Sequence, residues 1–357
     1  MPAFDHRTIA LTAALLMLGA AGGAVAQALS LPMPWMLGSL AASGVAVGLL
    51  QDGVLRSYSF PQRFRTFFVG LIGVMIGTQV TPELLGLAGE LPLTLGALVI
   101  FVALAHGGNH LIFRRIGGYD PPTAFYAATP GGIMESLFLG ERAGADLRIL
   151  TSQQFLRIIF VVTLVPAGLS IWLGHPVGSA AGMSAVGSQQ PLTAATLGLI
   201  ATVTLAGLAV AHFIHLPAAQ ITGPLLLAAG LTVWAGLDLQ LPVWLIMVAQ
   251  VVVGVSLGMR FKGVTAAMLR RSVWLSALSV GYMLILGGVF AVGLAQATDI
   301  PFLHLLISYA PGGVTEMSVI ALSLAANPAL VSLHHVSRIL MTVAALAVAQ
   351  RVWGGAR

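Results

Sequence analysis

The fold is decided by a stretch of sequence that occurs twice: residues 128–135 read ATPGGIME, and residues 310–316 read APGGVTE. Each copy lies inside an apolar segment, where proline removes a backbone donor and the glycine pair has low helix propensity. In a lipid bilayer, a broken helix is tolerated only where other protein or a water-filled cavity covers its backbone groups. Each break is followed by a glutamate, Glu135 or Glu316, which is costly to bury in a bilayer without a partner. A broken helix with a buried acid, made twice, predicts a binding site; a kinked packing helix is the structural alternative.

The composition identifies the class of protein. Hydrophobic residues make up 58% of the 357 positions and charged residues only 8%, whereas soluble domains carry about 25% charged residues. The chain is therefore predicted to be an all-α polytopic membrane protein whose surroundings are the lipid bilayer. The net charge of +5 comes from arginine clusters in loops, so it indicates membrane orientation and not direct nucleic-acid binding. The chain has no cysteine, which excludes disulfides and thiolate metal sites.

The two halves of the chain repeat each other. Three residues recur 181 positions later: Gly131 as Gly312, Glu135 as Glu316, and Arg157 as Arg338. Near the start the offset is 185, because Gly38 corresponds to Gly223. We therefore predict a tandem duplication with a first membrane repeat over residues 1–174, a linker over 175–189 and a second repeat over 190–357.

Corresponding loops of the two halves carry opposite charge. In the first half, a basic loop at Arg63 is followed by an acidic loop at Glu83. In the second half, the corresponding loops are acidic at Asp238 and basic over 260–271. Under the positive-inside rule, the halves lie in the membrane with opposite orientations, as inverted-topology repeats, and both termini are cytoplasmic.

Inversion constrains the number of membrane crossings. Each half has six apolar segments, but inversion requires an odd number of crossings, so one segment per half must fail to cross. The Pro-Gly-Gly segment is our candidate, as a re-entrant hairpin, which gives about ten transmembrane helices and two broken or re-entrant segments. In the alternative, the Pro-Gly-Gly segment crosses as an unwound helix while another segment fails to span. The sequence leaves both open.

The candidate site consists of polar residues inside apolar segments. Arg157 and Arg338 lie about twenty residues beyond the glutamates, and pairing Glu with Arg across adjacent helices is the least unfavourable way to bury both. Such a glutamate could bind a proton or cation, and such an arginine a carboxylate or phosphate; a purely structural ion pair is the alternative. The predicted substrate- or ion-binding residues are Thr129, Pro130, Gly131, Gly132, Glu135, Gln153, Gln154, Arg157, Pro311, Gly312, Gly313, Thr315, Glu316, His334, His335 and Arg338.

The halves differ just before each arginine. Gln153 and Gln154 precede Arg157, whereas His334 and His335 precede Arg338. Because histidine titrates near physiological pH, the second half is predicted to be the more proton-sensitive one; hydrogen bonding to the hairpin backbone is the alternative. No metal site or cofactor is predicted, because the closely spaced pairs His106–His110 and His212–His215 have no acid nearby.

Three doubled motifs resemble the bacterial AbrB-duplication family of membrane proteins. They are PWMLGSL (34–40) with QITGPLL (220–226), the two Pro-Gly-Gly stretches, and SQQFLRI (152–158) with HHVSRIL (334–340). The resemblance covers nearly the whole chain and implies a multi-pass protein of the bacterial inner membrane. Members carry the labels "ammonia monooxygenase" and "AbrB family regulator", and the family is similar to secondary transporters built from inverted repeats.

Three functions compete. We expect a secondary transporter of a small solute, with an anion as the leading candidate, coupled to protons or sodium and binding at the paired breaks. The alternative is a membrane-embedded regulator or sensor that affects gene expression through a partner. A membrane monooxygenase is the third, but the sequence shows no set of metal ligands for it, so we expect no enzyme activity. The sequence does not decide whether the protein forms a homodimer.

Overall fold

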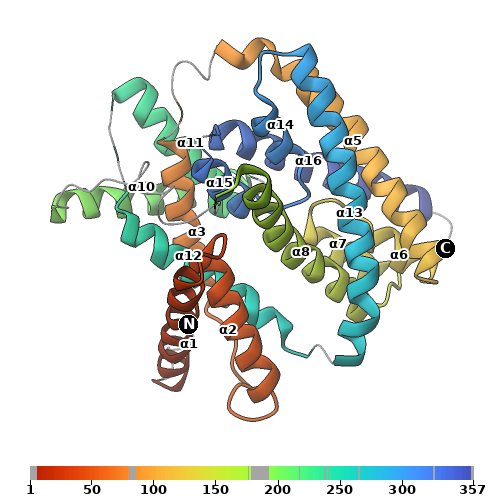
Figure 1. Ribbon diagram of the computed structural model, residues 1–357, viewed down its shortest axis with the longest axis horizontal. Coiled ribbons are helices and arrows are strands. Elements are labelled where there is room, and N and C mark those ends of the chain that lie inside the picture. The colour runs from red at the N-terminus through yellow and green to blue at the C-terminus, as the bar shows by residue number, and fades with distance from the viewer. Residues whose placement is uncertain are drawn as a thin grey trace. The chain divides into compact units, whose positions relative to one another are not determined.

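All regular elements in the described part of the chain are helices (Figure 1). The structure is a computed structural model, and it describes residues 6–78, 80, 86–175, 177, 193–216, 218–236, 239, 241–263, 266–324 and 326–354. Among these residues, seven helices are long and apolar enough to cross a membrane, and α2 (Pro34–Leu50) and α11 (Ala219–Ala235) are shorter apolar helices. The prediction of an all-α polytopic membrane protein is confirmed.

The chain divides into two compact units, and each unit contains segments from both halves of the sequence. Unit 1 comprises Met1–Thr81, Pro166–Gly263 and Leu322–Ala325, and unit 2 comprises Pro82–Val165, Val264–Ala321 and Ala326–Arg357. The predicted repeat boundaries stay a prediction, since residues 176 and 178–189 of the linker lie outside the described residues.

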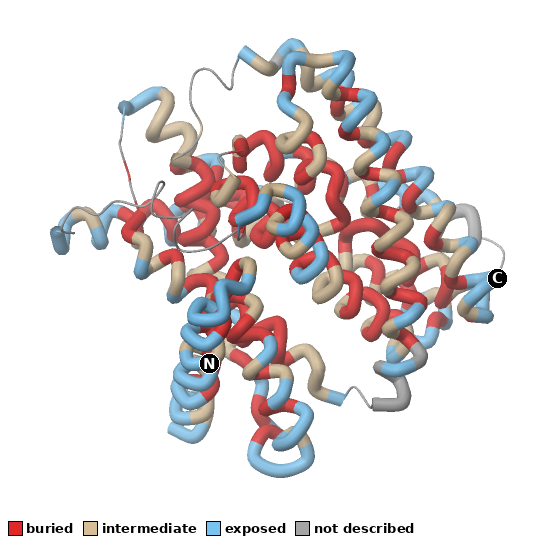
Figure 2. The backbone as a smooth tube through the Cα atoms, viewed as in Figure 1, coloured by how far each residue is buried: buried red, intermediate tan, exposed pale blue. Residues whose placement is uncertain are grey.

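Unit 1 is built from two similar sets of three helices. They are α1 (His6–Ala28), α2 and α3 (Gln62–Gly77) from the first half, and α10 (Ala194–Phe213), α11 and α12 (Val243–Gly258) from the second. α1 lies along α2 (Figure 1), and α10 lies along α11. The halves are joined by α2 packing on α12 and α3 packing on α11. Much of α1 is exposed (Figure 2), which suits a helix that faces lipid.

Glycines set the close approach of these paired helices. A Cβ at Gly254 or Gly258 of α12 would collide with α2 around Ser39 and Ser43. A Cβ on α3, at Gly73 or Gly77, would likewise collide with the backbone of α11. Small residues of this kind let membrane helices pack backbone to backbone, so the same contact is made twice, once by each half.

Corresponding helices of unit 1 run in opposite directions. At one end of the unit, the loop before α3 meets the segment after α12: Lys262 Nζ donates to the carbonyl oxygen of Tyr58 at 2.8 Å, and the N–H of Gly263 donates to Gln51 Oε1 at 2.9 Å. α3 therefore begins at the end where α12 finishes, although the two helices correspond under the 181-residue offset. This is the arrangement that inverted-topology repeats require.

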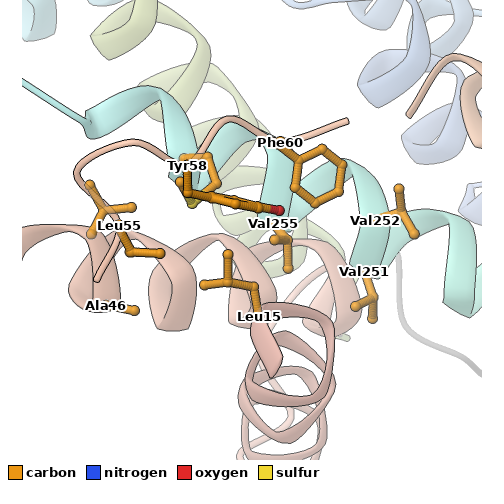
Figure 3. Close-up of a cluster of buried hydrophobic side chains, with 10 residues drawn as sticks. Leu15, Ala46, Leu55, Tyr58, Phe60, Val251, Val252 and Val255 are labelled. Carbon is orange, nitrogen blue, oxygen red and sulfur yellow. The ribbon is translucent and has the colours of Figure 1, made fainter. Parts of the chain in front are cut away.

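The same end of unit 1 holds a hydrophobic cluster (Figure 3). Leu15 of α1 and Val255 of α12 pack there with three residues of the loop between α2 and α3, namely Leu55, Tyr58 and Phe60. The Tyr58 hydroxyl is buried but lies 2.8 Å from Thr12 Oγ1, so its hydrogen-bonding capacity is met within the unit.

Unit 2 contains the broken segments and the helices that surround them. Its helices are α5 (Leu91–Leu111) with a π-helical end (Ile112–Ile116), α6 (Pro121–Ala127), α7 (Ile133–Arg142), α8 (Leu147–Leu173) up to Val165, α13 (Ala266–Ala297), α14 (Phe302–Tyr309), α15 (Val314–Ser323) up to Ala321, and α16 (Pro328–Gly354). A short 3₁₀ helix (Leu87–Gly89) precedes α5. α13 packs on α5 and α14, and α16 packs on α5, α7 and α14.

The first broken segment forms a hairpin. The N–H of Asp146, beyond the end of α7, donates to Thr123 Oγ1 near the start of α6 at 2.7 Å. Between these points, Gly140 of α7 lies against the side chain of Tyr126 in α6. α7 therefore returns alongside α6, which agrees with the re-entrant interpretation of this segment and not with an unwound crossing helix.

Candidate functional site

The first break occupies residues 128–132, between α6 and α7. Gly132 caps α7 with φ +62°, a left-handed conformation that favours glycine. The first N–H groups of α7 have no acceptors within the helix, so its N-terminus carries partial positive charge. Glu135, the third residue of α7, is half-buried and its carboxylate lies beside Gly132.

Arg157 of α8 contacts the backbone of this break. Its side chain is only 8% exposed, and Nη1 donates a hydrogen bond to the carbonyl oxygen of Thr129. The predicted ion pair with Glu135 is wrong: both residues are described, and no ion pair joins them. Arg157 instead donates to a carbonyl oxygen that the break leaves without a helical N–H partner, while the Glu135 carboxylate lies beside Gly132 at the positive end of its own helix.

The two glutamines before Arg157 join α8 to the hairpin. Gln154 Nε2 donates to the carbonyl oxygen of Tyr126 at 3.1 Å and to Thr129 Oγ1 at 2.8 Å. Gln153 Nε2 donates to Tyr119 Oη at 2.8 Å, and Gln153 Oε1 accepts from Ser276 of α13. Both glutamines are buried. Gln154 therefore binds the backbone of the hairpin directly.

The second break occupies residues 310–313, between α14 and α15. Arg338 of α16 is 1% exposed; Nη1 donates to the carbonyl oxygen of Ala310 at 2.6 Å, and Nη2 donates to that of Gly312. Glu316 is 6% exposed, and its carboxylate folds back over Gly313, where a Cβ would collide with it. Glu316 therefore lies at the positive end of its own short helix.

His335 is held by two hydrogen bonds of opposite direction. Arg338 Nη2 lies 2.7 Å from His335 Nδ1, and His335 Nε2 lies 3.1 Å from the carbonyl oxygen of Ile307. Because an arginine only donates and a carbonyl only accepts, Nδ1 accepts and Nε2 donates, and the ring is neutral. His334 Nδ1 donates to the carbonyl oxygen of Leu330 at 2.9 Å, and in the described part of the chain Nε2 has no partner.

The two breaks are held in the same way. The contact from Arg157 to the carbonyl oxygen of Thr129 corresponds, 181 residues later, to the contact from Arg338 to that of Ala310. The contact from Gln154 to Tyr126 likewise corresponds to the one from His335 to Ile307. The duplication therefore extends to the individual hydrogen bonds of the site, even where the side chains differ.

The two breaks also converge within unit 2. Gly131 lies against Ile339 and Thr342 of α16, so the first break packs one turn beyond Arg338. The guanidinium groups of Arg157 and Arg338 are close enough for their like charges to repel. Of the remaining predicted site residues, Pro130 and Pro311 are buried within the breaks, and Thr315 is the second residue of α15.

Comparison with known proteins identifies the family. Residues 35–354 match the family described as "Transition state regulatory protein AbrB". The chain belongs to the AbrB family. It is 25% identical over 267 residues to "Putative regulator AbrB" of Escherichia coli (strain K12), which covers 73% of this chain and 74% of that protein. It is 23% identical over 349 residues to "Uncharacterized protein YhjN" of Bacillus subtilis (strain 168), which covers 92% of this chain and 89% of that protein. No solved structure matches this AbrB-family chain.

Some residues of this AbrB-family site were not predicted from the sequence. Ser136 of α7 is fully buried, and its Oγ donates to the carbonyl oxygen of Tyr126 at 2.6 Å. Tyr119 and Ser276 complete the network around Gln153. Ser136 could have been predicted as a site residue, because it directly follows Glu135 in an apolar segment. Ser276 could not, because nothing in the sequence links it to the distant Gln153. Among the described residues, no group of three or more His, Asp or Glu side chains is placed to hold a metal ion.

Proposed function

We propose that this AbrB-family protein is a secondary transporter of a small anionic solute in the bacterial inner membrane. The observation that carries the proposal is the convergence, in unit 2, of two broken segments whose backbone carbonyl oxygens are each bound by a buried arginine. Secondary transporters built from inverted repeats bind substrates at discontinuous helices, whose half-helix N-termini face anionic groups. α7 and α15 supply two such N-termini.

The charges of the site support coupling to a cation. Arg157 and Arg338 carry two positive charges, and Glu135 and Glu316 carry two negative charges when ionised. A monovalent anion adds one negative charge to a buried site, which is unfavourable unless a proton or a sodium ion enters with it. Glu135 is half-buried, whereas Glu316 is buried with 6% of its surface exposed. Because a coupling ion must reach its carboxylate from solution, we assign the coupling ion to Glu135, the more exposed of the two.

The experiment begins with the purified protein in detergent. Its thermal unfolding midpoint is measured with the sodium salts of chloride, acetate, butyrate, sulfate and phosphate, and each anion that raises the midpoint is tested for uptake into proteoliposomes. We expect protein-dependent uptake that responds to a proton or sodium gradient, and no uptake by Arg157→Gln. Binding without uptake above that of empty liposomes would contradict the transporter. Such a result would favour a sensor, the second candidate, which the name of the Escherichia coli relative supports.

A further inference from the structure

We propose that the anion is a carboxylate, that Arg157 binds it through the edge formed by Nε and Nη2, and that Arg338 is a positioning residue for the second break. This inference rests on the proposed function and names the chemical class of its substrate. It assigns different roles to two arginines that the duplication makes equivalent in sequence.

Arg157 has donors to spare. A guanidinium carries five N–H donors, and Arg157 uses Nη1 for the carbonyl oxygen of Thr129. Nε has no acceptor among the described residues, and neither does Nη2. Since the side chain is only 8% exposed, these donors cannot be fully satisfied by bulk water, and a buried charged donor without a partner is strongly unfavourable. The structure therefore leaves one edge of this guanidinium for a ligand.

The geometry of that edge suits a carboxylate. The Nε–H and one Nη2–H point in the same direction, and two parallel N–H groups match the two oxygens of a carboxylate in a bidentate contact. Thr129 holds the opposite corner of the guanidinium beside the first break, next to the N-terminus of α7. On the side of α16, Ile339, Thr342 and Val343 lie against Gly131 and Gly132, and the Thr342 hydroxyl already donates to the carbonyl oxygen of Arg338. Such surroundings suit a planar carboxylate with a small aliphatic remainder better than a tetrahedral oxyanion, which presents more oxygens than one edge can satisfy.

The Nη donors of Arg338 already bind acceptors among the described residues, whereas Nε and Nη2 of Arg157 do not. Its Nη1 donates to Ala310, and its Nη2 donates both to Gly312 and to His335. Only Nε lacks an acceptor in the described part of the chain, so no complete edge is left for a bidentate contact. Arg338 instead fixes the second break and adds positive charge close to Arg157.

The test compares three arginine-to-lysine substitutions, at Arg157, at Arg338 and at a control position. Arg157→Lys keeps the charge but removes the planar edge. The matched control is Arg65→Lys on α3 of unit 1, where Arg65 donates to Ser256 Oγ at 3.1 Å and to Gln220 Oε1 at 3.2 Å. Dissociation constants are measured by titration calorimetry with sodium acetate, butyrate, chloride, sulfate and phosphate. We expect Arg157→Lys to weaken carboxylate binding by about ten- to hundredfold, the effect of losing one hydrogen bond to a charged group. Chloride binding should be unchanged, and Arg65→Lys should match the unsubstituted protein.

The ranking of anions on the unsubstituted protein tests the inference even if Arg157→Lys fails to fold. Sulfate or phosphate binding more tightly than both carboxylates would overturn it, and so would carboxylate binding that survives Arg157→Lys. Arg338→Lys should lower the thermal midpoint while preserving the ratio of carboxylate to chloride affinity. Equal uptake by Arg157→Lys and the unsubstituted protein would refute this role of Arg157 and leave the transporter standing. Tight carboxylate binding without any uptake would refute the transporter and leave this role of Arg157 standing.

Discussion

His335 lies between a cation and a carbonyl oxygen, and these two neighbours determine its protonation state. Protonation at Nδ1 would place an N–H against the Arg338 N–H donor, so the existing hydrogen bond would be lost. The sequence predicted a proton-sensitive second half from this histidine pair. The structure supports the alternative for His335, because both ring nitrogens hold the second break together.

Substitution of His335 should therefore reveal a structural role. Gln154 occupies the corresponding position and donates to Tyr126 as His335 donates to Ile307. We expect His335→Gln to retain most of the stability, whereas His335→Ala should lower the free energy of unfolding by about 1–3 kcal/mol, because it leaves buried polar groups unsatisfied. Unfolding in detergent measures both variants. Equal losses of stability in His335→Gln and His335→Ala would contradict the structural role of His335. A pH profile of uptake that shifts in the stable variant His335→Gln would contradict it as well.

The two glutamates should respond differently to neutralisation. Glu135→Gln removes the half-buried carboxylate to which we assign the coupling ion, so uptake should lose its dependence on the ion gradient while exchange of bound anion continues. Glu316→Gln removes a buried charge at the N-terminus of α15 and should lower the stability, with the helix dipole contributing up to about 2 kcal/mol, its size in a partly buried geometry. Uptake and counterflow in proteoliposomes measure both. Loss of coupling in Glu316→Gln but not in Glu135→Gln would reverse the assignment.

The hairpin of α6 and α7 depends on close contact at Gly140. A Cβ there would lie 2.7 Å from Leu150 Cδ2 and 3.3 Å from Tyr126 Cβ. Gly140→Leu should therefore destabilise unit 2 by about 1–3 kcal/mol, as overpacking of a well-packed core does. Gly96→Leu on α5 is the matched control, because among the described residues no atom outside its own stretch of helix lies within 4 Å of its added Cβ. Equal thermal midpoints for the two variants would contradict the packing of α7 against Tyr126 of α6 and Leu150 of α8.

The positions of the breaks, the glutamates and the arginines could be predicted from the sequence because the duplication repeats them at one offset. The partners of the arginines could not. A side-chain pattern suggests another side chain as partner, but Arg157 and Arg338 bind backbone carbonyl oxygens, which every residue carries. The location of each glutamate in the first turn of a short helix also depends on where that helix begins, which is the least predictable part of an element.

On the scale of the whole molecule, the charges of the loops predicted inversion, but nothing in them predicted how the halves interleave. Unit 1 pairs α2 with α12 and α3 with α11, so each pair joins one helix from each half. The glycines that permit these contacts were visible as repeated residues. Which helix each glycine faces is a property of the packing, since a helix surface rich in small residues can accept several partners.

Inversion itself can be tested by labelling, because the chain contains no cysteine of its own. Single cysteines are introduced as Arg63→Cys, Arg270→Cys, Glu83→Cys and Asp238→Cys, and a membrane-impermeant maleimide is applied to spheroplasts and to inverted vesicles. Arg63 is at the start of α3, at the end of unit 1 where Arg7 donates to Val54 and Lys262 to Tyr58. This end is rich in positive charge and is expected to face the cytoplasm.

We therefore expect Arg63→Cys and Arg270→Cys to react only in inverted vesicles. Glu83→Cys and Asp238→Cys, at acidic positions outside the described residues, should react only in spheroplasts. The cysteine-free parent reports background labelling in both preparations. If all four positions reacted from the faces opposite to these, inversion would stand and only the cytoplasmic assignment would be wrong. If positions 83 and 238 reacted from different faces, the acidic loops of the two halves would not share a side, and the antiparallel course of α3 and α12 would need an explanation other than inverted repeats.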